Sequence, residues 1–313
     1  MKIIVIGNGK MATDCIRWML MSESHTLAHI FYENEKNVNP RVLLELIESH
    51  HLPSSTIVKI HDEANLKLMQ SIAPDWIFNI NCYQYLRESV LSIPKNGVIN
   101  FHNGPLPRYG GVNIPSWAII NGEAQHGVTW HLVNAEIDAG EVLSQAHFEL
   151  TARMTAAQLM VKCIQVGLQL FEQHWADWVE GKVQPTSQQG ERLYFGLKDK
   201  VPNGGLLTKN QTSVHWDKMI RGLHLFPYPN EFGFAHILLD QKKYYIIAGR
   251  KWEEELEGEW GTFVVLENKG FVIQLCDGPF LVTQLADEQW QLVKPNAISI
   301  GWNTSQFPTI EGE

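Results

Sequence analysis

Three polar residues in two segments of this sequence have the types that carbonyl chemistry needs. Asn100 and His102 stand two positions apart at the end of an apolar run, and Asp138 lies in a later segment, two residues before a glycine. An asparagine amide can donate a hydrogen bond to an oxygen that becomes negative, and a histidine can exchange protons near neutral pH. A nearby carboxylate would orient the imidazole and favour its protonated form. Such a set suits the attack of an amine on a formamide-like carbonyl.

The same residues also have ordinary structural explanations. An isolated Asn-x-His on a strand is often a buried hydrogen-bonded pair, and an aspartate close to a glycine often shapes a turn. We expect His126 and His131 to be structural, although His131 is also a candidate to face the amine. The joint pattern of Asn100, His102 and Asp138 favours catalysis, because loops that leave neighbouring strands can converge.

A sheet must position these residues, and the first half of the chain has the pattern of one. Apolar, β-branched runs predict strands at residues 3–6, 26–31, 56–60, 76–80 and 97–101, with helices between them at 11–21 and 42–49. This alternation predicts an α/β fold, a mostly parallel sheet with helices on both faces and ligands at the carboxyl ends of its strands. Residues 127–133 and 141–150 would add two strands. Alternate residues of a strand share a face, so Asn100 and His102 should point the same way.

The second half predicts a long helix and then a different kind of sheet. Residues 155–179 have helical periodicity, residues 181–205 have the composition of a connection between domains, and residues 213–223 form a short helix. Short runs with turn residues between them predict a small antiparallel β-barrel, from strands at 232–239, 243–248, 261–266, 271–275 and 279–285. We therefore expect a catalytic domain at 1–195, a linker with a short helix at 196–228 and a barrel domain at 229–313.

A glycine-rich turn at the first strand supports a competing function. Gly7-Asn8-Gly9-Lys10-Met11-Ala12 follows a strand and opens a helix, as a dinucleotide-binding fingerprint does, and Glu33 falls near the place of a ribose-binding acid. This reading predicts an NAD-dependent oxidoreductase. The glycines would equally serve a tight turn and close packing.

Composition excludes several other classes of protein. The chain of 313 residues has 34 acidic and 25 basic residues, a net charge of −9, and no Lys/Arg-rich run, which disfavours binding a large RNA. Its four scattered cysteines predict neither disulfides nor a zinc site, so we expect no metal. The chain opens directly into a strand, without a basic leader or a membrane segment, which predicts a cytoplasmic protein.

The motifs around the three polar residues resemble one enzyme family closely. Residues 100–111, together with 127–131 and 137–141, are similar to the catalytic core of the folate-dependent formyltransferases. The similarity covers most of residues 1–193, and the family's Asn, His and Asp fall on Asn100, His102 and Asp138. It implies a Rossmann-like domain followed by a small OB-like barrel, and N10-formyltetrahydrofolate as the co-substrate that supplies the formyl group.

The resemblance also implies binding residues and an acceptor. The folate site would be lined by the loop after the fourth strand and by the segment before Asp138, namely Tyr83, Tyr85, Leu86, Val133 and Ile137, although Tyr85 and Leu86 could instead begin a helix. The acceptor would contact the loop of Arg108, Tyr109, Gly110 and Gly111, with Lys209 and Arg221 as further candidates to hold phosphate.

The choice of acceptor depends on where the sequence departs from the tRNA-modifying branch. Asn103-Gly104-Pro105 replaces a Gly-Ser-Leu pattern, and no basic insertion follows the second strand. We therefore expect a small-molecule amine on a dTDP- or UDP-linked sugar, with no nucleic-acid or membrane partner and a homodimer through the barrel as an option. The alternatives are an aminoacyl carrier protein, a hydroxyornithine, or a catalytically idle relative that only binds ligand.

Overall fold

The computed structural model describes residues 1–33, 40–82, 84–226, 232–239, 242–266 and 269–294. Tyr83 therefore lies outside the described residues. The chain divides into two compact units, one made of residues 1–114, 125–149 and 160–196, the other of residues 115–124, 150–159 and 197–313. The expected domain limits at 195 and 228 stay a prediction.

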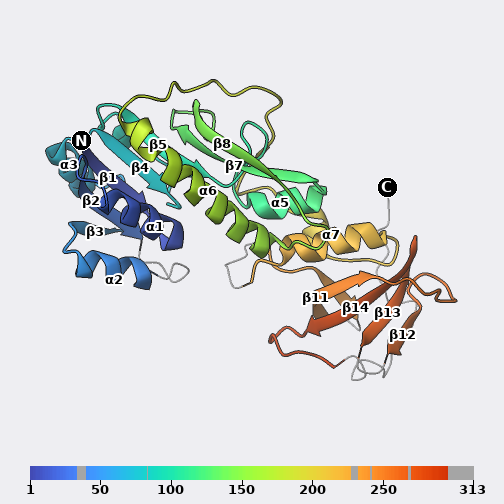
Figure 1. Cartoon of the computed structure of the whole chain (residues 1–313). Coiled ribbons are helices and arrows are strands. Elements are labelled where there is room, and N and C mark those ends of the chain that lie inside the picture. The colour runs from blue at the N-terminus through green and yellow to red at the C-terminus, as the bar shows by residue number, and fades with distance from the viewer. Residues whose placement is uncertain (34–39, 83, 227–231, 240–241, 267–268, 295–313) are drawn as a thin grey trace. The chain divides into compact units, whose positions relative to one another are not determined.

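The first unit is built on a seven-stranded sheet of order β3-β2-β1-β4-β5-β7-β8 (Figure 1). Strands β1 to β5 pair in parallel, whereas β7 pairs antiparallel with β5 and β8 antiparallel with β7. The strands are β1 (Lys2–Gly7), β2 (Thr26–Glu33), β3 (Ser54–Ile57), β4 (Trp76–Ile80), β5 (Gly97–His102), β7 (Gln125–Leu132) and β8 (Val142–Glu149). The predicted α/β fold, with its two added strands, is confirmed.

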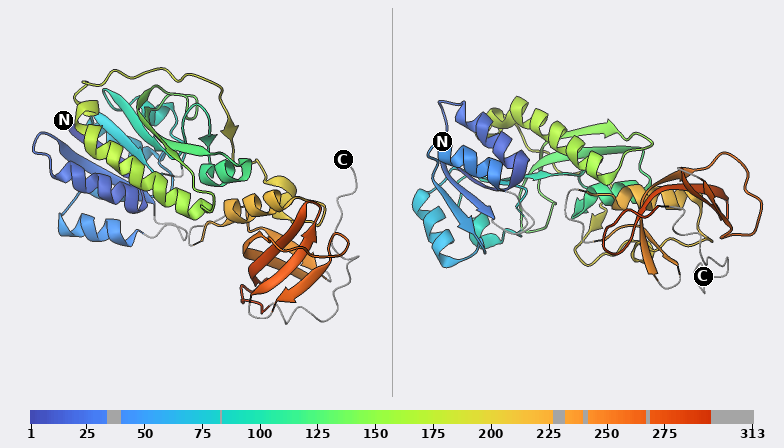
Figure 2. Two further views of the ribbon diagram at one scale, coloured as in Figure 1. Left: turned by 45° about the vertical axis from the view of Figure 1, so that its right-hand side comes forward. Right: turned by 90° about the horizontal axis from the view of Figure 1, so that it is seen from below.

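Helices cover both faces of this sheet (Figure 2). On one face α6 (Ala156–Val179) packs Phe171 against Phe78 and Trp130, at ring-centroid distances of 5.8 and 5.3 Å. On the other face Met69 and Val90 join a buried cluster with strand residues such as Val98. They come from α3 (Glu63–Ile72) and α4 (Glu88–Leu91), and the first unit also contains α1 (Gly9–Leu20) and α2 (Arg41–Ser49). Nearly all of α5 (Ile114–Asn121) belongs to the second unit.

The alternation of β5 decides where its polar residues point. Phe101 lies against Trp130, with ring centroids 5.2 Å apart, whereas Val98 belongs to the cluster on the opposite face. Because successive strand residues alternate, Asn100 and His102 share the face of Val98. The register also sets Asn100 beside Asn79 of β4 and His131 of β7. Two neighbouring strands thus supply polar partners for one residue.

The second unit contains α7 (Ser213–Leu223) and a five-stranded antiparallel sheet. Thr212 caps α7, since its hydroxyl accepts a hydrogen bond from the His215 amide at 3.1 Å, and Trp216 packs on Phe280. The sheet order is β10-β11-β14-β13-β12, so the separate small antiparallel sheet is confirmed. Its strands are β10 (His236–Leu239), β11 (Lys242–Lys251), β12 (Phe263–Leu266), β13 (Gly270–Leu275) and β14 (Gly278–Ala286).

The structure differs from the expected elements in several places, and the strand expected at 232–239 begins only at His236. The third strand, expected at 56–60, ends at Ile57, and the Ile60 amide donates instead to the Gln84 side chain at 2.7 Å. Tyr85 and Leu86 do not begin a helix, because α4 starts at Glu88. No helix in the described part of the chain is long and apolar enough to span a membrane.

Candidate active site

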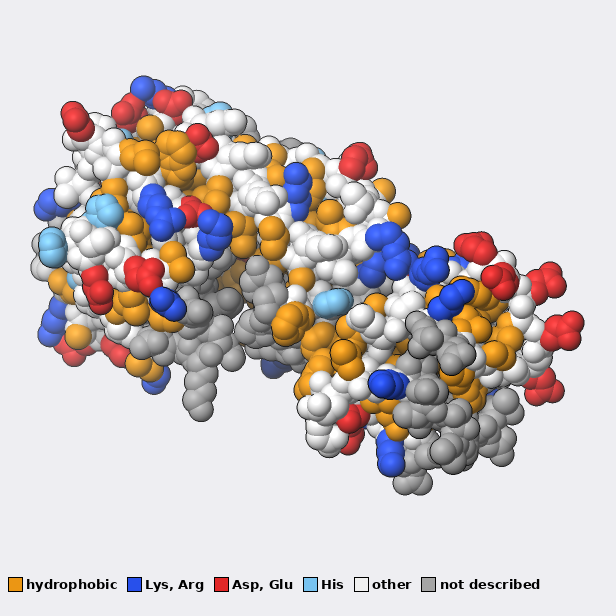
Figure 3. Space-filling model, turned by 60° about the horizontal axis from the view of Figure 1, so that its bottom comes forward, with side chains coloured by type: hydrophobic (Ala, Val, Ile, Leu, Met, Phe, Trp, Pro, Cys, Tyr) orange, Lys and Arg blue, Asp and Glu red, His pale blue; other side chains and the backbone are white. Residues whose placement is uncertain are grey.

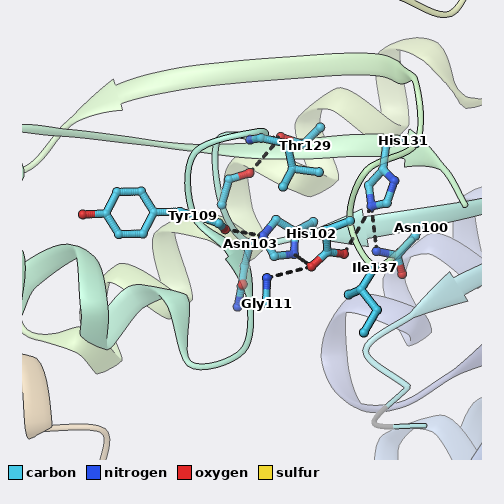
Figure 4. A network of polar contacts seen from close by, with 12 residues as sticks. Asn100, His102, Asn103, Tyr109, Gly111, Thr129, His131 and Ile137 are labelled. Atoms are coloured by element: carbon cyan, nitrogen blue, oxygen red, sulfur yellow. Dashed lines mark hydrogen bonds and ion pairs between the residues drawn. The ribbon is translucent and has the colours of Figure 1, made fainter. Parts of the chain in front are cut away.

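His102 ends β5 and lies close to the Asp138 carboxylate; Figure 4 shows the polar contacts around His102. The imidazole Nδ1 lies 3.5 Å from Asp138 Oδ2, and both side chains are mostly buried, 6% and 12% exposed. On its other side the ring donates from Nε2 to the carbonyl oxygen of Tyr109 at 2.7 Å. The structure therefore brings together the histidine and the aspartate that the sequence places 36 positions apart.

The Tyr109 carbonyl fixes the tautomer of His102. A carbonyl oxygen can only accept, so Nε2 must carry a proton, and the lone pair of the neutral ring lies on Nδ1. Protonation at Nδ1 then places a positive charge toward the Asp138 carboxylate. Nδ1 is consequently the ring nitrogen that could accept a proton.

Asp138 is held by both its backbone and its carboxylate. It lies in the loop between β7 and β8 with φ +53°, in the left-handed region that non-glycine residues rarely adopt. Its Oδ2 accepts a hydrogen bond from the Gly111 amide at 2.8 Å, and its Oδ1 lies 3.7 Å from His131 Nε2. Each oxygen therefore has a polar neighbour of its own.

A chain of donors orients the Asn100 amide. His131 Nδ1 lies 2.8 Å from the Leu132 carbonyl, to which it can only donate, so neutral His131 accepts at Nε2 from Asn100 Nδ2 at 3.0 Å. The Asn100 Oδ1 accepts in turn from Asn79 at 2.7 Å. One N–H of Asn100 is committed to His131, and no contact among the described residues occupies the second. The sequence signal for Asn79 is slight, a single polar residue in an apolar strand, and its role follows from the register.

Burial keeps His131 neutral. Loss of solvation lowers the pKa of His131 to about 4. The neighbouring His102 also lowers this pKa, whereas the negative charge of Asp138 raises it. His131 was expected to be structural, with a role at the amine as an option. The structure places it between Asn100 and Asp138, where it serves as the acceptor that fixes the Asn100 amide.

Replacing His131 by glutamine should remove part of the acid sensitivity of the fold. The pKa of His131 is near 6.5 in the unfolded chain and about 4 when folded, so its contribution to stability is present at neutral pH and is lost as the pH falls through that interval. The full difference amounts to roughly 3 kcal/mol below pH 4. Urea unfolding of both proteins from pH 7 to pH 4 measures it. Parallel pH curves for the two proteins would contradict the prediction, because other buried histidines contribute equally to both.

The residues predicted to bind folate fall into two groups. Leu86 is 3% exposed and belongs to the core cluster, and Val133 packs against the same cluster. Both side chains therefore contribute to the core next to the predicted folate loops. Tyr85 and Ile137 are 48% and 42% exposed, and the Tyr85 hydroxyl donates to the Ala135 carbonyl at 2.9 Å. This hydrogen bond joins the two loops that the sequence assigns to the folate site, and Figure 4 shows Ile137 near Asn100 and His102. Their apolar surface suits a flat heterocycle.

Most groups of the loop predicted to contact the acceptor already contact other parts of the protein. Tyr109 is 1% exposed, and the amides of Gly110 and Gly111 donate to Leu193 and to Asp138. Arg108 is the exposed member, with its guanidinium 5.4 Å from the centre of the Tyr109 ring. Elsewhere in the chain, Arg221 pairs with Asp217 and donates to the Met154 carbonyl, which gives it a structural role.

The glycine-rich turn at β1 is filled by side chains of the protein. Asn8 donates to the buried Glu33 carboxylate at 2.6 Å, and Gln84 donates to its other oxygen at 2.9 Å. A Cβ on Gly7 would lie 2.5 Å from the Ile80 carbonyl oxygen, so glycine is needed there for packing. Glu33 is therefore bonded within the fold instead of presented to a ribose, which argues against the dinucleotide alternative.

Other chemistries find little support in the described residues. They contain no group of three or more His, Cys, Asp or Glu side chains that could hold a metal ion. Burial, and to a smaller extent the charge of Glu33, raises the pKa of the Cys82 thiol to about 12. That thiol stays protonated near neutral pH and is a poor nucleophile.

Comparisons with known proteins find relatives over most of this chain. A family described as "Formyl transferase" matches residues 1–174. A methionyl-tRNA formyltransferase of Halalkalibacterium halodurans is 28% identical over 291 residues, 88% of this chain and 87% of the relative.

Two solved structures share the fold. An N-formyltransferase from Helicobacter canadensis, in complex with folinic acid and dTDP-3-aminofucose, aligns with a TM-score of 0.67 and 18% identity over 90% of this chain and 99% of its own. The sugar 3N-formyl transferase WlaRD, crystallised with dTDP and 5-N-formyl-THF, aligns with a TM-score of 0.68 and 19% identity over 90% and 97%.

Proposed function

We propose that this chain, which belongs to the formyl transferase family and is a folate-dependent formyltransferase, formylates the primary amine of a nucleotide-linked amino sugar. The observation that carries the reaction is the arrangement of His102 against Asp138 beside the oriented amide of Asn100. The donor is a reduced folate, N10-formyltetrahydrofolate.

Formyl transfer makes one carbon–nitrogen bond and breaks another. The amine attacks the formyl carbon, the carbonyl electrons move to its oxygen, and the attacking nitrogen loses a proton. The remaining N–H of Asn100 stabilises the oxyanion, and His102 exchanges the proton at Nδ1. When the intermediate collapses, the bond to N10 of the folate breaks and N10 receives the proton. Asp138 favours the imidazolium that forms in between.

Charge supports a small acceptor. The net charge is −9, and Figure 3 shows Lys and Arg side chains in small groups interspersed with Asp and Glu on the face that it draws. An extended polyanion requires several clustered cations, whereas a pyrophosphate needs only a few donors. Arg108 is the first candidate among these donors; its side chain is 47% exposed, and its guanidinium lies 3.9 Å from the Glu191 carboxylate. The likeness of the fold to the two sugar formyltransferases described above supports the same choice.

One observation favours a second acceptor. The similarity to methionyl-tRNA formyltransferase extends over 88% of this chain and so includes part of the C-terminal sheet. Methionyl-tRNA is therefore the alternative that the experiment must test.

A panel of acceptors decides between them. Purified protein and N10-formyltetrahydrofolate are incubated with dTDP- and UDP-linked amino sugars, aminoacyl carrier protein, hydroxyornithine and charged initiator tRNA, and tetrahydrofolate release is followed. We expect turnover on an amino-sugar nucleotide, with weak dependence on moderate salt, and none on tRNA. Turnover on tRNA alone would refute the proposed acceptor, and turnover on carrier protein or hydroxyornithine alone would transfer the assignment to peptide or siderophore synthesis.

A further inference from the structure

A segment after α6, residues 186–195, contacts both catalytic loops, and we call it the strap. Its composition predicts a connection between domains, but it belongs to the first unit. Figure 1 shows it as part of the yellow-green loop that leaves the end of α6. It begins with a bridge between Thr186 and Val142 of β8 and ends in β9 (Tyr194–Phe195), which pairs with β6 (Gly110–Gly111).

At its C-terminal end the strap holds the loop that carries the Tyr109 carbonyl. The Gly110 amide donates to Leu193 at 2.9 Å, and the Phe195 ring stacks on Tyr109 at 5.8 Å with an interplanar angle of 23°. A Cβ on Gly111 would lie 1.9 Å from the Phe195 carbonyl oxygen, so the close approach requires glycine there. The loop that bonds His102 is thus fixed by the strap.

Earlier in the strap, two side chains hold the loop that carries Asp138. Gln188 Nε2 donates to the Asp138 carbonyl at 2.9 Å and to the Gly140 carbonyl at 2.8 Å. Arg192 pairs with the Glu136 carboxylate and donates to the Ile137 carbonyl at 2.8 Å. The Gln188 and Arg192 side chains therefore reach three carbonyls of the loop, those of residues 137, 138 and 140.

The hydrogen bonds from Gln188 and Arg192 hold the Asp138 backbone in its left-handed conformation. A non-glycine residue at φ +53° is about 1–2 kcal/mol less stable than in a common region, so the loop favours relaxation unless its surroundings hold it. Relaxation would turn the carboxylate away from the His102 Nδ1, which lies only 3.5 Å away. Gln188 contacts the two carbonyls that define this turn.

We propose that Gln188 is a positioning residue for Asp138, and that through it the strap sets the distance between the Asp138 carboxylate and His102. This role rests on the proposed use of Asp138 in formyl transfer. Gln188 touches no reacting atom and acts only through the backbone of the loop.

The test replaces Gln188 by methionine, which keeps the length of the side chain and removes its donors. The matched control is Gln189→Met, the exposed neighbour on the strap. With the acceptor identified by the panel, we expect kcat to fall about 10- to 100-fold in Gln188→Met while KM for the folate changes less than about twofold. Gln189→Met should retain wild-type kcat. Equal kcat values in the two variants would overturn the proposal.

A double-mutant cycle separates this role from a general structural one. If Gln188 acts through the Asp138 carboxylate, Gln188→Met should cost almost nothing more in an Asp138→Asn background, which is already severely impaired. Additive losses would show that Gln188 acts by another route and would overturn the proposal.

An independent measurement needs no acceptor, so a wrong acceptor and a wrong strap assignment can be told apart. Amide hydrogen exchange of residues 133–141 should be faster in Gln188→Met than in wild type and unchanged in Gln189→Met. Unchanged exchange in Gln188→Met would refute the positioning role even if the acceptor is correct. Faster exchange with no turnover on any amine would refute the proposed acceptor alone.

Discussion

Replacing His102 by alanine should lower kcat roughly 10²- to 10⁴-fold, because the site loses the group that moves the proton between the two nitrogens. The Tyr109 carbonyl holds the ring through Nε2 at 2.7 Å and leaves Nδ1 3.5 Å from the Asp138 carboxylate, whereas alanine places no proton-exchanging group there. Steady-state kinetics at saturating folate, with thermal unfolding as the check on folding, measure the effect.

A glutamine at position 102 shows whether the loss of activity comes from the missing proton-transfer group or from the missing side-chain volume. His102→Gln keeps a donor for the Tyr109 carbonyl but cannot titrate, so it should be about as impaired as the alanine variant. The matched control is His126→Gln, a buried histidine in the same sheet whose Nε2 lies 2.9 Å from the Asn103 carbonyl. We expect it to keep most of the activity. A wild-type rate for either His102 variant would remove His102 from the mechanism.

Replacing Asn100 by alanine should lower kcat by roughly 10² to 10³, the usual loss of one oxyanion donor, or about 3–4 kcal/mol of barrier. Asn100→Asp keeps the shape but presents an acceptor toward the developing negative charge, so its kcat should be at least as low. KM for the folate should change little, because the bond strengthens only in the transition state. The comparison is Asn79→Ala, which leaves the donor but removes the bond to its Oδ1 at 2.7 Å. A loss greater for Asn79 than for Asn100 would contradict the assignment.

Several elements of both units could be predicted because their signals are local. The strand at 76–80 and the helix at 213–223 have the expected bounds, since apolar periodicity and turn residues mark their ends. The pairing of His102 with Asp138 was also expected, because loops from neighbouring strands converge at one edge of the sheet.

Other features depend on contacts between distant residues. Helix α5 has apolar residues on every side, as in Ile114, Trp117 and Ile119, and so lacks the periodicity of a surface helix. Gln188 lies 50 positions from Asp138 in a polar stretch that has the composition of a linker. The hydrogen bonds from Asn8 and Gln84 to the Glu33 carboxylate likewise form only because the strands pair in one register. None of these contacts leaves a pattern in one sequence.

The donor chain from Asn79 through Asn100 to His131 also determines which inhibitors the site would accept. Because the chain ends on the Leu132 carbonyl, its polarity cannot be reversed by a flip of either amide or by the other tautomer of His131. The atom that meets Asn100 must therefore be a hydrogen-bond acceptor, such as the oxygen of a hydrated ketone or a sulfoxide. A compound that presents an amino group there would meet a second donor and bind weakly, however well its heterocycle fits the folate loops.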